Sequence, residues 1–240
     1  MPRHGKKFTK ALELLEEDKL YAPEEAVALL RQMTYANFDE TIEVHYRLGI
    51  DPRQADQTIR STVTLPHGTG KTVRVLVFAI GDAARVALEA GADYVGSDDI
   101  VQQINDGWLE FDATIAMADQ MSKVGGLGRV LGRRGLMPNP RSGTVVRAAE
   151  DLPDVIGDLK GGRVEFRNDR SGLVHTAIGK KSFDDNQILG NLYALTDAIQ
   201  RNKPSGAKGV YCRSITLTST MAPGIPLDVQ ETMTAASEAA

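Results

Sequence analysis

The sequence predicts an α+β domain built from both ends of the chain, with an α/β domain of the Rossmann-like open-sheet kind inserted into it. Two observations point to this fold class. Apolar and polar residues alternate near residues 42–48, the pattern of a half-buried strand. A nearly continuous apolar run at residues 73–80 is typical of a strand covered on both faces, and strands and helices alternate closely after it.

These patterns place the domain boundaries. We assign residues 1–67 and 159–228 to the discontinuous domain and residues 68–158 to the inserted domain. Residues 229–240 are mostly small or polar, so we expect them to form a disordered tail.

The first part of the chain predicts two helices and two strands. Apolar residues recur at helical spacing within residues 8–33, and Pro23 suits the first turn of the second helix. Strands are expected at residues 41–48 and 63–65. Five elements of the inserted domain follow, namely a strand at 73–80, a helix at 82–90, a strand at 92–95, a helix at 99–105 and a strand at 112–116.

The C-terminal part returns to alternating strands. Residues 164–166 and 173–178 predict two strands joined by a hairpin turn at residues 167–172. An amphipathic helix is expected over residues 188–199, followed by a strand at residues 210–221.

Composition is that of an ordinary soluble protein, with 42% hydrophobic and 25% charged residues. The single cysteine, Cys212, excludes an intramolecular disulfide and suits a reducing compartment. No apolar run approaches the length of a membrane span, so we expect a cytoplasmic protein without a membrane partner. The four histidines are widely separated, and no spacing predicts a metal site or a cofactor.

The predicted strand at residues 210–221 is rich in hydroxyl groups and follows a basic turn that contains Lys208. Although the net charge is −4, residues 198–227 contain no acidic residue. Hydroxyls hydrogen-bond to phosphate and ribose, and cations add affinity, so this stretch suits a sugar-phosphate surface. The alternative is that threonine is simply a good strand former. The hydroxyl residues are Ser214, Thr216, Thr218, Ser219 and Thr220.

A second acid-free stretch, residues 120–149, combines many glycines with cations. We interpret it as a secondary basic loop whose backbone N–H groups and guanidinium groups approach phosphate closely. A flexible, solvated loop without a ligand is an equal alternative. The arginines expected to contribute are Arg129, Arg133, Arg134 and Arg141.

Two motifs imitate nucleotide-binding enzymes. The stretch from Gly68 to Thr72 resembles the end of a P-loop, but Leu65 occupies the position of the required first glycine and a strand follows instead of preceding. The sequence Gly126-x-Gly128 lacks the third glycine of a dinucleotide fingerprint, because residue 131 is leucine. A nucleotide-dependent α/β enzyme is therefore the weaker alternative, and we expect a protein that is not an enzyme.

Seven further stretches carry a recognisable pattern, namely Phe38–Val44, Leu48–Arg53, Leu65–Lys71, Gly91–Gly96, Gly135–Pro140, Val164–Asp169 and Pro204–Gly209. These stretches resemble the bacterial-type family of the first protein of the large ribosomal subunit (ribosomal protein L-one). The resemblance extends from about His4 to Met221.

The resemblance implies an RNA-binding protein of the mobile ribosomal stalk. Such a protein binds large-subunit rRNA beside other ribosomal components, helps to release exit-site tRNA and represses translation of its own operon mRNA. By motif position, the residues expected to face RNA are Phe38, Thr41, Arg167, Asn168, Ser214, Thr218, Ser219, Thr220 and Met221, and Lys208 of the basic turn is expected to join them.

Three positions depart from the family pattern. Asn37 stands where a basic residue is usual, Arg133 stands where proline is frequent, and Ala222 stands where glycine commonly follows the methionine. A side chain at residue 222 would interfere with the closest approach of RNA to the backbone.

Overall fold

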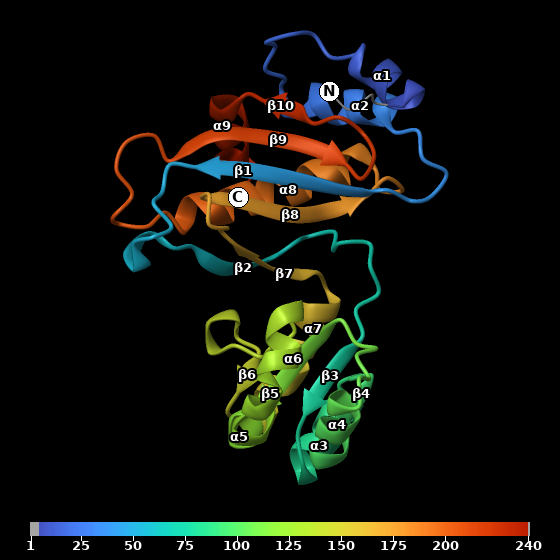
Figure 1. The fold of residues 1–240 in the computed structure, drawn as a ribbon, viewed down its shortest axis with the longest axis vertical. Coiled ribbons are helices and arrows are strands. Elements are labelled where there is room, and N and C mark those ends of the chain that lie inside the picture. Colours follow the sequence, from blue (N-terminus) through green and yellow to red (C-terminus); the bar gives the residue numbers. More distant parts are fainter. Residues whose placement is uncertain (1–4, 240) are drawn as a thin grey trace. The chain divides into compact units, whose positions relative to one another are not determined.

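A computed structural model describes residues 5–239, which divide into two compact units (Figure 1). Unit 1 contains the residues up to Gly70 and those from Val164 onward, and unit 2 spans Lys71–Arg163. The predicted boundary at residue 158 falls inside helix α7 (Leu152–Lys160). This helix belongs to unit 2 because its Leu152 and Ile156 side chains are buried in that unit's core.

Unit 1 begins with the two expected helices, α1 (Lys6–Leu12) and α2 (Pro23–Met33). Pro23 begins α2, where a missing N–H group has no cost to the helix, and two glutamates follow in the first turn. The buried stripe of α2 joins the core of unit 1.

A four-stranded antiparallel sheet forms the centre of unit 1, in the order β10-β9-β1-β8. The strands are β1 (Thr41–Leu48), β8 (Leu173–Lys180), β9 (Cys212–Ser219) and β10 (Ile225–Leu227). Every second residue of β1 is buried, as the alternating sequence predicts. Helix α8 (Asp185–Arg201) packs against the buried side with Leu192, Leu195 and Ile199.

A separate two-stranded sheet pairs β2 (Arg60–Thr64) with β7 (Arg163–Arg167), after the short turn η1 (Ala55–Gln57). The predicted turn is present, because the Asp169 N–H donates to the Leu173 carbonyl at 2.7 Å and the Gly172 N–H donates to the Asp169 carbonyl at 3.3 Å. The expected pairing of the two strands as a hairpin was wrong, because β7 and β8 belong to different sheets and the antiparallel bridge between Asn168 and Val174 does not extend into β7. Turn composition in the sequence does not reveal which strand will be the partner.

The prediction of a disordered tail was also wrong for residues 229–239, which form helix α9 (Val229–Ala239); Ala240 lies outside the described residues. Asp228 begins the helix, and its carboxylate accepts the backbone N–H groups of Gln230 and Glu231. Thr232 and Ala236 are buried, and α9 lies beside α8. The small residues of α9 let the two helices approach closely. The sequence alone did not predict this helix, because residues 229–239 contain few large apolar side chains.

Unit 2 contains the expected parallel sheet, in the order β4-β3-β5-β6. Its strands are β3 (Val75–Phe78), β4 (Tyr94–Gly96), β5 (Ala113–Met117) and β6 (Val145–Val146). Val75 and Val77 pack on one side with α3 (Gly81–Glu89) and α7, whereas Leu76 and Phe78 pack on the other side with α4 (Asp98–Asn105). This arrangement explains the continuous apolar run, because β3 has no polar face.

The glycine-rich stretch of unit 2 is largely helical, so its interpretation as a basic loop was wrong. Residues 121–134 form a continuous helical run of α5 (Met121–Val124), η3 (Gly125–Leu127) and α6 (Gly128–Arg134). Val124, Leu127 and Leu131 recur at helical spacing and are buried in the core. Shorter turns lie at η2 (Ala118–Gln120), η4 (Pro140–Ser142) and η5 (Ala149–Asp151).

Candidate nucleic-acid interface

One face of the central sheet of unit 1 is not covered by a helix within the described residues. Helices α8 and α9 lie behind β9, β1 and β8 in Figure 1. The outward side chains of these strands are partly or fully exposed. We call this surface the open face, and it consists of Thr41, Glu43, His45, Arg47, His175, Ala177, Lys180, Ser214, Thr216 and Thr218.

The open face is polar and weakly basic. Its single carboxylate, Glu43, stands against Arg47, Lys180 and two histidines. Lys180 Nζ donates a hydrogen bond to Thr41 Oγ1 at 2.8 Å, which fixes the ammonium group on this surface. Residues 198–227 contain no acidic residue, and the neighbouring strands β1 and β8 add only Glu43 to the open face.

Two hydroxyl groups of the open face are free to bind a ligand. The Ser214 and Thr216 hydroxyls make no hydrogen bond to any residue between 5 and 239, whereas Thr218 Oγ1 donates to the backbone carbonyls of Ser219 and Ala222, each at 3.1 Å. Strand pairing places Ser214 beside Arg47 and Thr216 beside His45. A row of free hydroxyls next to cations can hydrogen-bond to ribose and phosphate oxygens.

Ser219, which we expected at the RNA surface, faces the opposite way. Its side chain is 2% exposed, because strand alternation groups it with the core residues Ile215 and Leu217. The expectation of direct RNA contact was wrong for this residue. Its Oγ donates a hydrogen bond to Glu40 Oε2 at 2.5 Å.

Glu40 is fully buried and binds three donors from two segments of the chain. The backbone N–H groups of Ala36 and Met221 donate to it at 2.9 and 3.2 Å, in addition to Ser219. Burial alone would raise its pKa, but these hydrogen bonds and the nearby Lys181 ammonium hold the pKa below the usual value. The carboxylate thus joins the segment before β1 to the segment after β9, a role that the sequence did not reveal.

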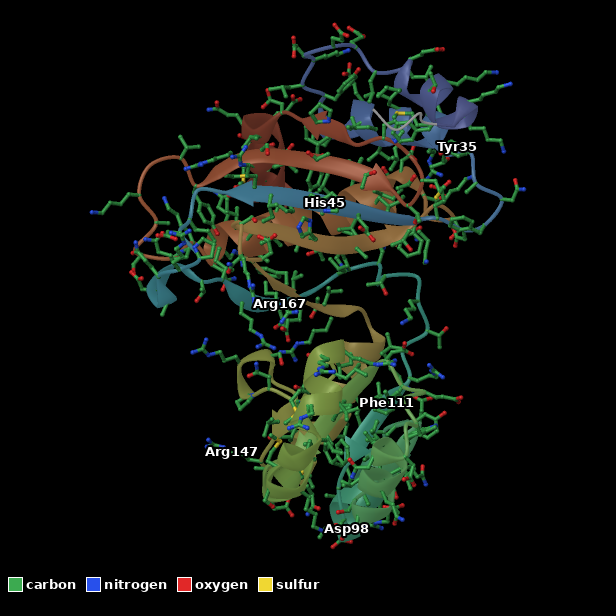
Figure 2. The ribbon with its side chains drawn as sticks, viewed as in Figure 1. Tyr35, His45, Asp98, Phe111, Arg147 and Arg167 are labelled. Atoms are coloured by element: carbon green, nitrogen blue, oxygen red, sulfur yellow. The ribbon has the colours of Figure 1, made fainter. Side chains whose placement is uncertain are left out.

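This junction presents an exposed rim beside the open face. Phe38 is 54% exposed and Met221 is 45% exposed, an unusual state for large apolar side chains. The hydroxyl of Tyr35, which Figure 2 labels, donates to the Met221 carbonyl at 2.9 Å. The Thr220 N–H donates to the Thr41 carbonyl at 3.1 Å, and Thr220 Oγ1 accepts the Thr41 N–H at 3.0 Å.

Two histidines meet at the centre of the open face. His45 and His175 are directly opposite in the register of β1 and β8, with their Nδ1 atoms 2.8 Å apart. Desolvation and the proximity of His175 lower the pKa of His45, and the Glu43 carboxylate, 4.0 Å away, opposes that shift. Asp169 lies 4.0 Å from the other side of His175.

Arg167 and Asn168 lie beside this face on β7 and the segment that follows it. Arg167 is exposed and lines a groove of about 1010 Å³ that also contains Arg53, Arg170 and His175. The Asn168 amide has a structural role, because its Oδ1 accepts the Ile59 N–H at 2.6 Å and its Nδ2 donates to the Asp169 carbonyl at 2.9 Å. Glu165 and Asp169 also line the groove, so the three arginines give it a small excess of positive charge.

Lys208 is exposed, but the structure does not place it with the rim residues. It precedes β9, whereas Thr220 and Met221 follow the strand, so the length of β9 separates them. The hollow around Lys208 is also lined by Asp51 and Asp56. Residues 198–227 contain no acidic residue, but the fold places two aspartates from another part of the chain around Lys208.

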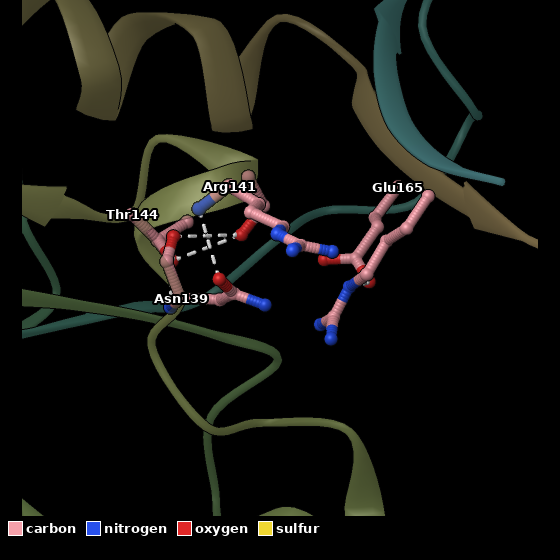
Figure 3. Close-up of polar contacts among 6 residues, drawn as sticks. Asn139, Arg141, Thr144 and Glu165 are labelled. Atoms are coloured by element: carbon pink, nitrogen blue, oxygen red, sulfur yellow. Dashed lines mark hydrogen bonds and ion pairs between the residues drawn. The ribbon is translucent and has the colours of Figure 1, made fainter. Parts of the chain in front are cut away.

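The predicted arginines of unit 2 lie on α6 and on the following turn. Arg129, Arg133 and Arg134 are exposed on the helical run, where backbone N–H groups already bond within helices. Arg141 is exposed in a tight turn: Asn139 Oδ1 accepts its N–H at 2.8 Å, and Thr144 Oγ1 accepts the Asn139 N–H at the same distance (Figure 3). Phosphate binding there would depend on guanidinium groups alone.

The carboxyl edge of the parallel sheet in unit 2 does not suit a nucleotide. The first turns of α3 and α4 carry Asp82, Asp98 and Asp99, which would repel phosphate at both helix N-termini. Among residues 5–239, no cluster of three or more histidine, cysteine or acidic side chains could hold a metal ion. No helix in the same range is long and apolar enough to cross a membrane.

Comparison with known proteins identifies the family. The sequence profile of the Ribosomal protein L1p/L10e family matches residues 30–223. The chain belongs to the ribosomal protein L1 family. Its relatives include proteins named large ribosomal subunit protein uL1 from Thermomicrobium roseum, 64% identical over 97% of both chains, and from Chloroflexus aurantiacus, 59% identical over 95% of this chain and 96% of that protein. The corresponding protein of Thermobifida fusca is 53% identical over 99% of this chain and the whole of its own.

Membership of the L1 family confirms the resemblance inferred from the sequence motifs. L1 proteins are ribosomal proteins and not enzymes, so the nucleotide-dependent enzyme is set aside. The family also implies association with the large ribosomal subunit and its RNA, and thereby location on the cytoplasmic ribosome.

The structure locates the three departures from the L1 pattern. Asn37 is exposed beside Phe38, and Arg133 is exposed on α6. Ala222 is 9% exposed, so its methyl group points into the protein and leaves the surface of that turn clear.

Proposed function

We propose that the open face and its rim bind large-subunit rRNA at the mobile stalk of the ribosome. The observation that carries this proposal is the pair of unbonded hydroxyls on an uncovered sheet, Ser214 beside Arg47 and Thr216 beside His45. Hydroxyls fix the position of a ribose-phosphate backbone, and the cations supply the salt-dependent part of the affinity.

The rim would extend this contact with apolar groups. Phe38 offers an aromatic surface on which an unpaired base can stack, and Met221 offers a flexible apolar neighbour. The groove lined by Arg53, Arg167 and Arg170 would bind a further stretch of RNA backbone. Ser219 and Glu40 act by positioning the rim and not by touching RNA.

Two further activities are part of the proposal and rest on the family. The same face would bind the mRNA of the protein's own operon and repress its translation, because one binding surface can recognise the same RNA structure in both molecules. On the ribosome, the protein would assist the release of tRNA from the exit site.

Sequencing of the RNA that co-purifies with the chain tests the proposal. We expect large-subunit rRNA, with operon mRNA as a second species. A salt titration of the bound rRNA then tests the chemistry: if about six phosphates are neutralised, affinity falls roughly 10³-fold between 50 and 200 mM salt. Random cellular RNA, or affinity that does not depend on salt, would contradict the proposal.

A further inference from the structure

A groove beside helix α9 has no part in the proposed function. Its volume is about 760 Å³, and its walls come from the end of α8, the segment that leads into β9, and one side of α9. None of its lining residues belongs to the open face or to the rim. We call it the α9 groove.

Apolar side chains line part of the α9 groove. Val229 and Met233 of α9 are half-buried, and Val210 is 70% exposed. The backbone around Val210 is held in place, because the Gly49 N–H donates to the Tyr211 carbonyl at 2.6 Å and a Cβ atom at residue 49 would clash with the Val210 carbonyl oxygen. The fold therefore keeps a large apolar side chain in solvent at this groove, which is typical of an interaction site.

Two cations and no acidic residue line the α9 groove. Lys203 and Arg213 form no ion pair within residues 5–239. Arg213 also lines the hollow around Lys208, where Asp51 and Asp56 offset part of its charge. Lys203 and Arg213 together give the α9 groove a small excess of positive charge next to its apolar side chains.

A β-bulge places Arg213 in the wall of the groove. In the pairing of β1 with β9, Arg47 is opposite Ser214 and Leu48 is opposite Cys212, so Arg213 is the extra residue without a partner. A bulge interrupts the ladder and changes the direction of the side chain that it carries. The position of Arg213 is therefore part of the construction of the sheet.

We propose that the α9 groove binds a short segment of a partner protein in which carboxylates flank an apolar side chain. The apolar side chain packs against Val210 and Met233, and the carboxylates pair with Lys203 and Arg213. A ribose-phosphate backbone fits less well, because it gains nothing from exposed valine and methionine side chains, and two cations neutralise few phosphates. The inference does not depend on the proposed function, since it uses no residue of the open face or the rim.

Selection of peptides by the full chain tests the proposal without knowledge of the partner. Peptides of about 12 residues that bind the wild type, from a random displayed library, are counter-selected against Lys203→Glu/Arg213→Glu, which reverses the charge of the groove. We expect the peptides that bind only the wild type to carry aspartate or glutamate beside leucine, isoleucine or phenylalanine. Peptides without acidic residues, or none that distinguishes the two proteins, would overturn the proposal.

The affinity of a selected peptide then tests the two kinds of contact separately. Fluorescence anisotropy should show a loss of about tenfold or more in the charge-reversed variant and of several-fold in Val210→Gln. Lys6→Glu/Lys10→Glu is the matched control for charge, since it removes two exposed lysines of unit 1 outside the groove. Leu20→Gln is the control for apolar contact, because Leu20 is 58% exposed and also lies outside the groove. Equal losses in the groove variants and their controls would contradict binding at this site.

Binding of large-subunit rRNA separates this inference from the proposed function. The charge-reversed variant should bind rRNA at least as well as the Lys6→Glu/Lys10→Glu control, because the groove is not part of the open face. Loss of rRNA affinity in the charge-reversed variant alone would assign the groove to RNA and overturn the inference. Failure of the wild type to bind rRNA would instead contradict the proposed function and leave the peptide result standing.

Discussion

The Ser219 hydroxyl donates a hydrogen bond to the buried Glu40 carboxylate at 2.5 Å and so joins the end of β9 to the segment before β1. Both side chains point away from the candidate RNA surface. Their effect on function is therefore indirect, because they hold Phe38 and Met221 where a ligand can reach them.

Glu40→Gln should destabilise the protein at neutral pH. The amide cannot accept all three hydrogen bonds as well as the carboxylate, and an unsatisfied buried group costs about 1–3 kcal/mol. Because the folded-state pKa of Glu40 is lowered, its ionisation stabilises the fold above the unfolded value of 4.5, and this contribution is lost as pH falls through the folded pKa. Urea unfolding should thus show a difference between wild type and Glu40→Gln that is largest near pH 7 and shrinks as the pH falls below 4.5.

Glu43→Gln is the control for this experiment, because Glu43 lies three residues along the chain but on the partly exposed open face. It should change the free energy of unfolding by less than about 0.5 kcal/mol. Equal effects of the two variants would show that Glu40 has no special role in holding the rim.

RNA affinity should rise as pH falls from 8 to about 5.5. His45 has a lowered pKa in the free protein, so it is neutral at pH 7, and bound phosphates would favour its protonated form. Filter binding at constant ionic strength should therefore show tighter binding at the acidic end.

His45→Gln should remove most of this pH dependence while leaving the fold intact. The acids that face the pair, Glu43 and Asp169, are 4.0 Å from the imidazoles and would dampen the response without reversing it. Affinity that falls on acidification in the wild type would contradict the placement of RNA over the histidines.

Helix α9 should contribute to the stability of unit 1. Ala236→Asp places a carboxylate at a position that is 1% exposed, and the desolvation of a charge there should cost several kcal/mol. Ser237→Asp, one residue further along and exposed, is the matched control and should be nearly neutral. Thermal unfolding with the same Tm for Ala236→Asp and wild type would mean that residues 229–239 do not pack as described.

Strands and helices with a strong periodic pattern of apolar residues were predictable from the sequence. Elements that depend on contacts with distant parts of the chain were not. The alternation in β1 and the apolar run of β3 each reflect the burial of the strand itself, which local sequence encodes. The helical run 121–134 was mistaken for a loop because its glycines and arginines outweighed the spacing of Val124, Leu127 and Leu131. Helix α9 was missed because its small residues matter only beside α8.

The candidate site was predictable only in part. Exposure of Phe38, Ser214, Thr220 and Met221 agrees with their expected place at the surface, while their contact with RNA remains a prediction. Period-two alternation from Ile215 and Leu217 already groups Ser219 with the core, and this signal was available in the sequence. The pairing of His45 with His175 depends on strand register, which a single sequence does not give.

The affinity of Ser214→Ala/Thr216→Val for large-subunit rRNA tests the central claim most directly, because these hydroxyls bond nothing else between residues 5 and 239. Thr220→Val is less suitable, since it also removes the acceptor of the Thr41 N–H. Thr234→Val/Ser237→Ala on α9 is the matched control. The account predicts a loss of about 1–3 kcal/mol in binding for the open-face variant and none for the control; equal affinity of both variants and wild type would contradict it.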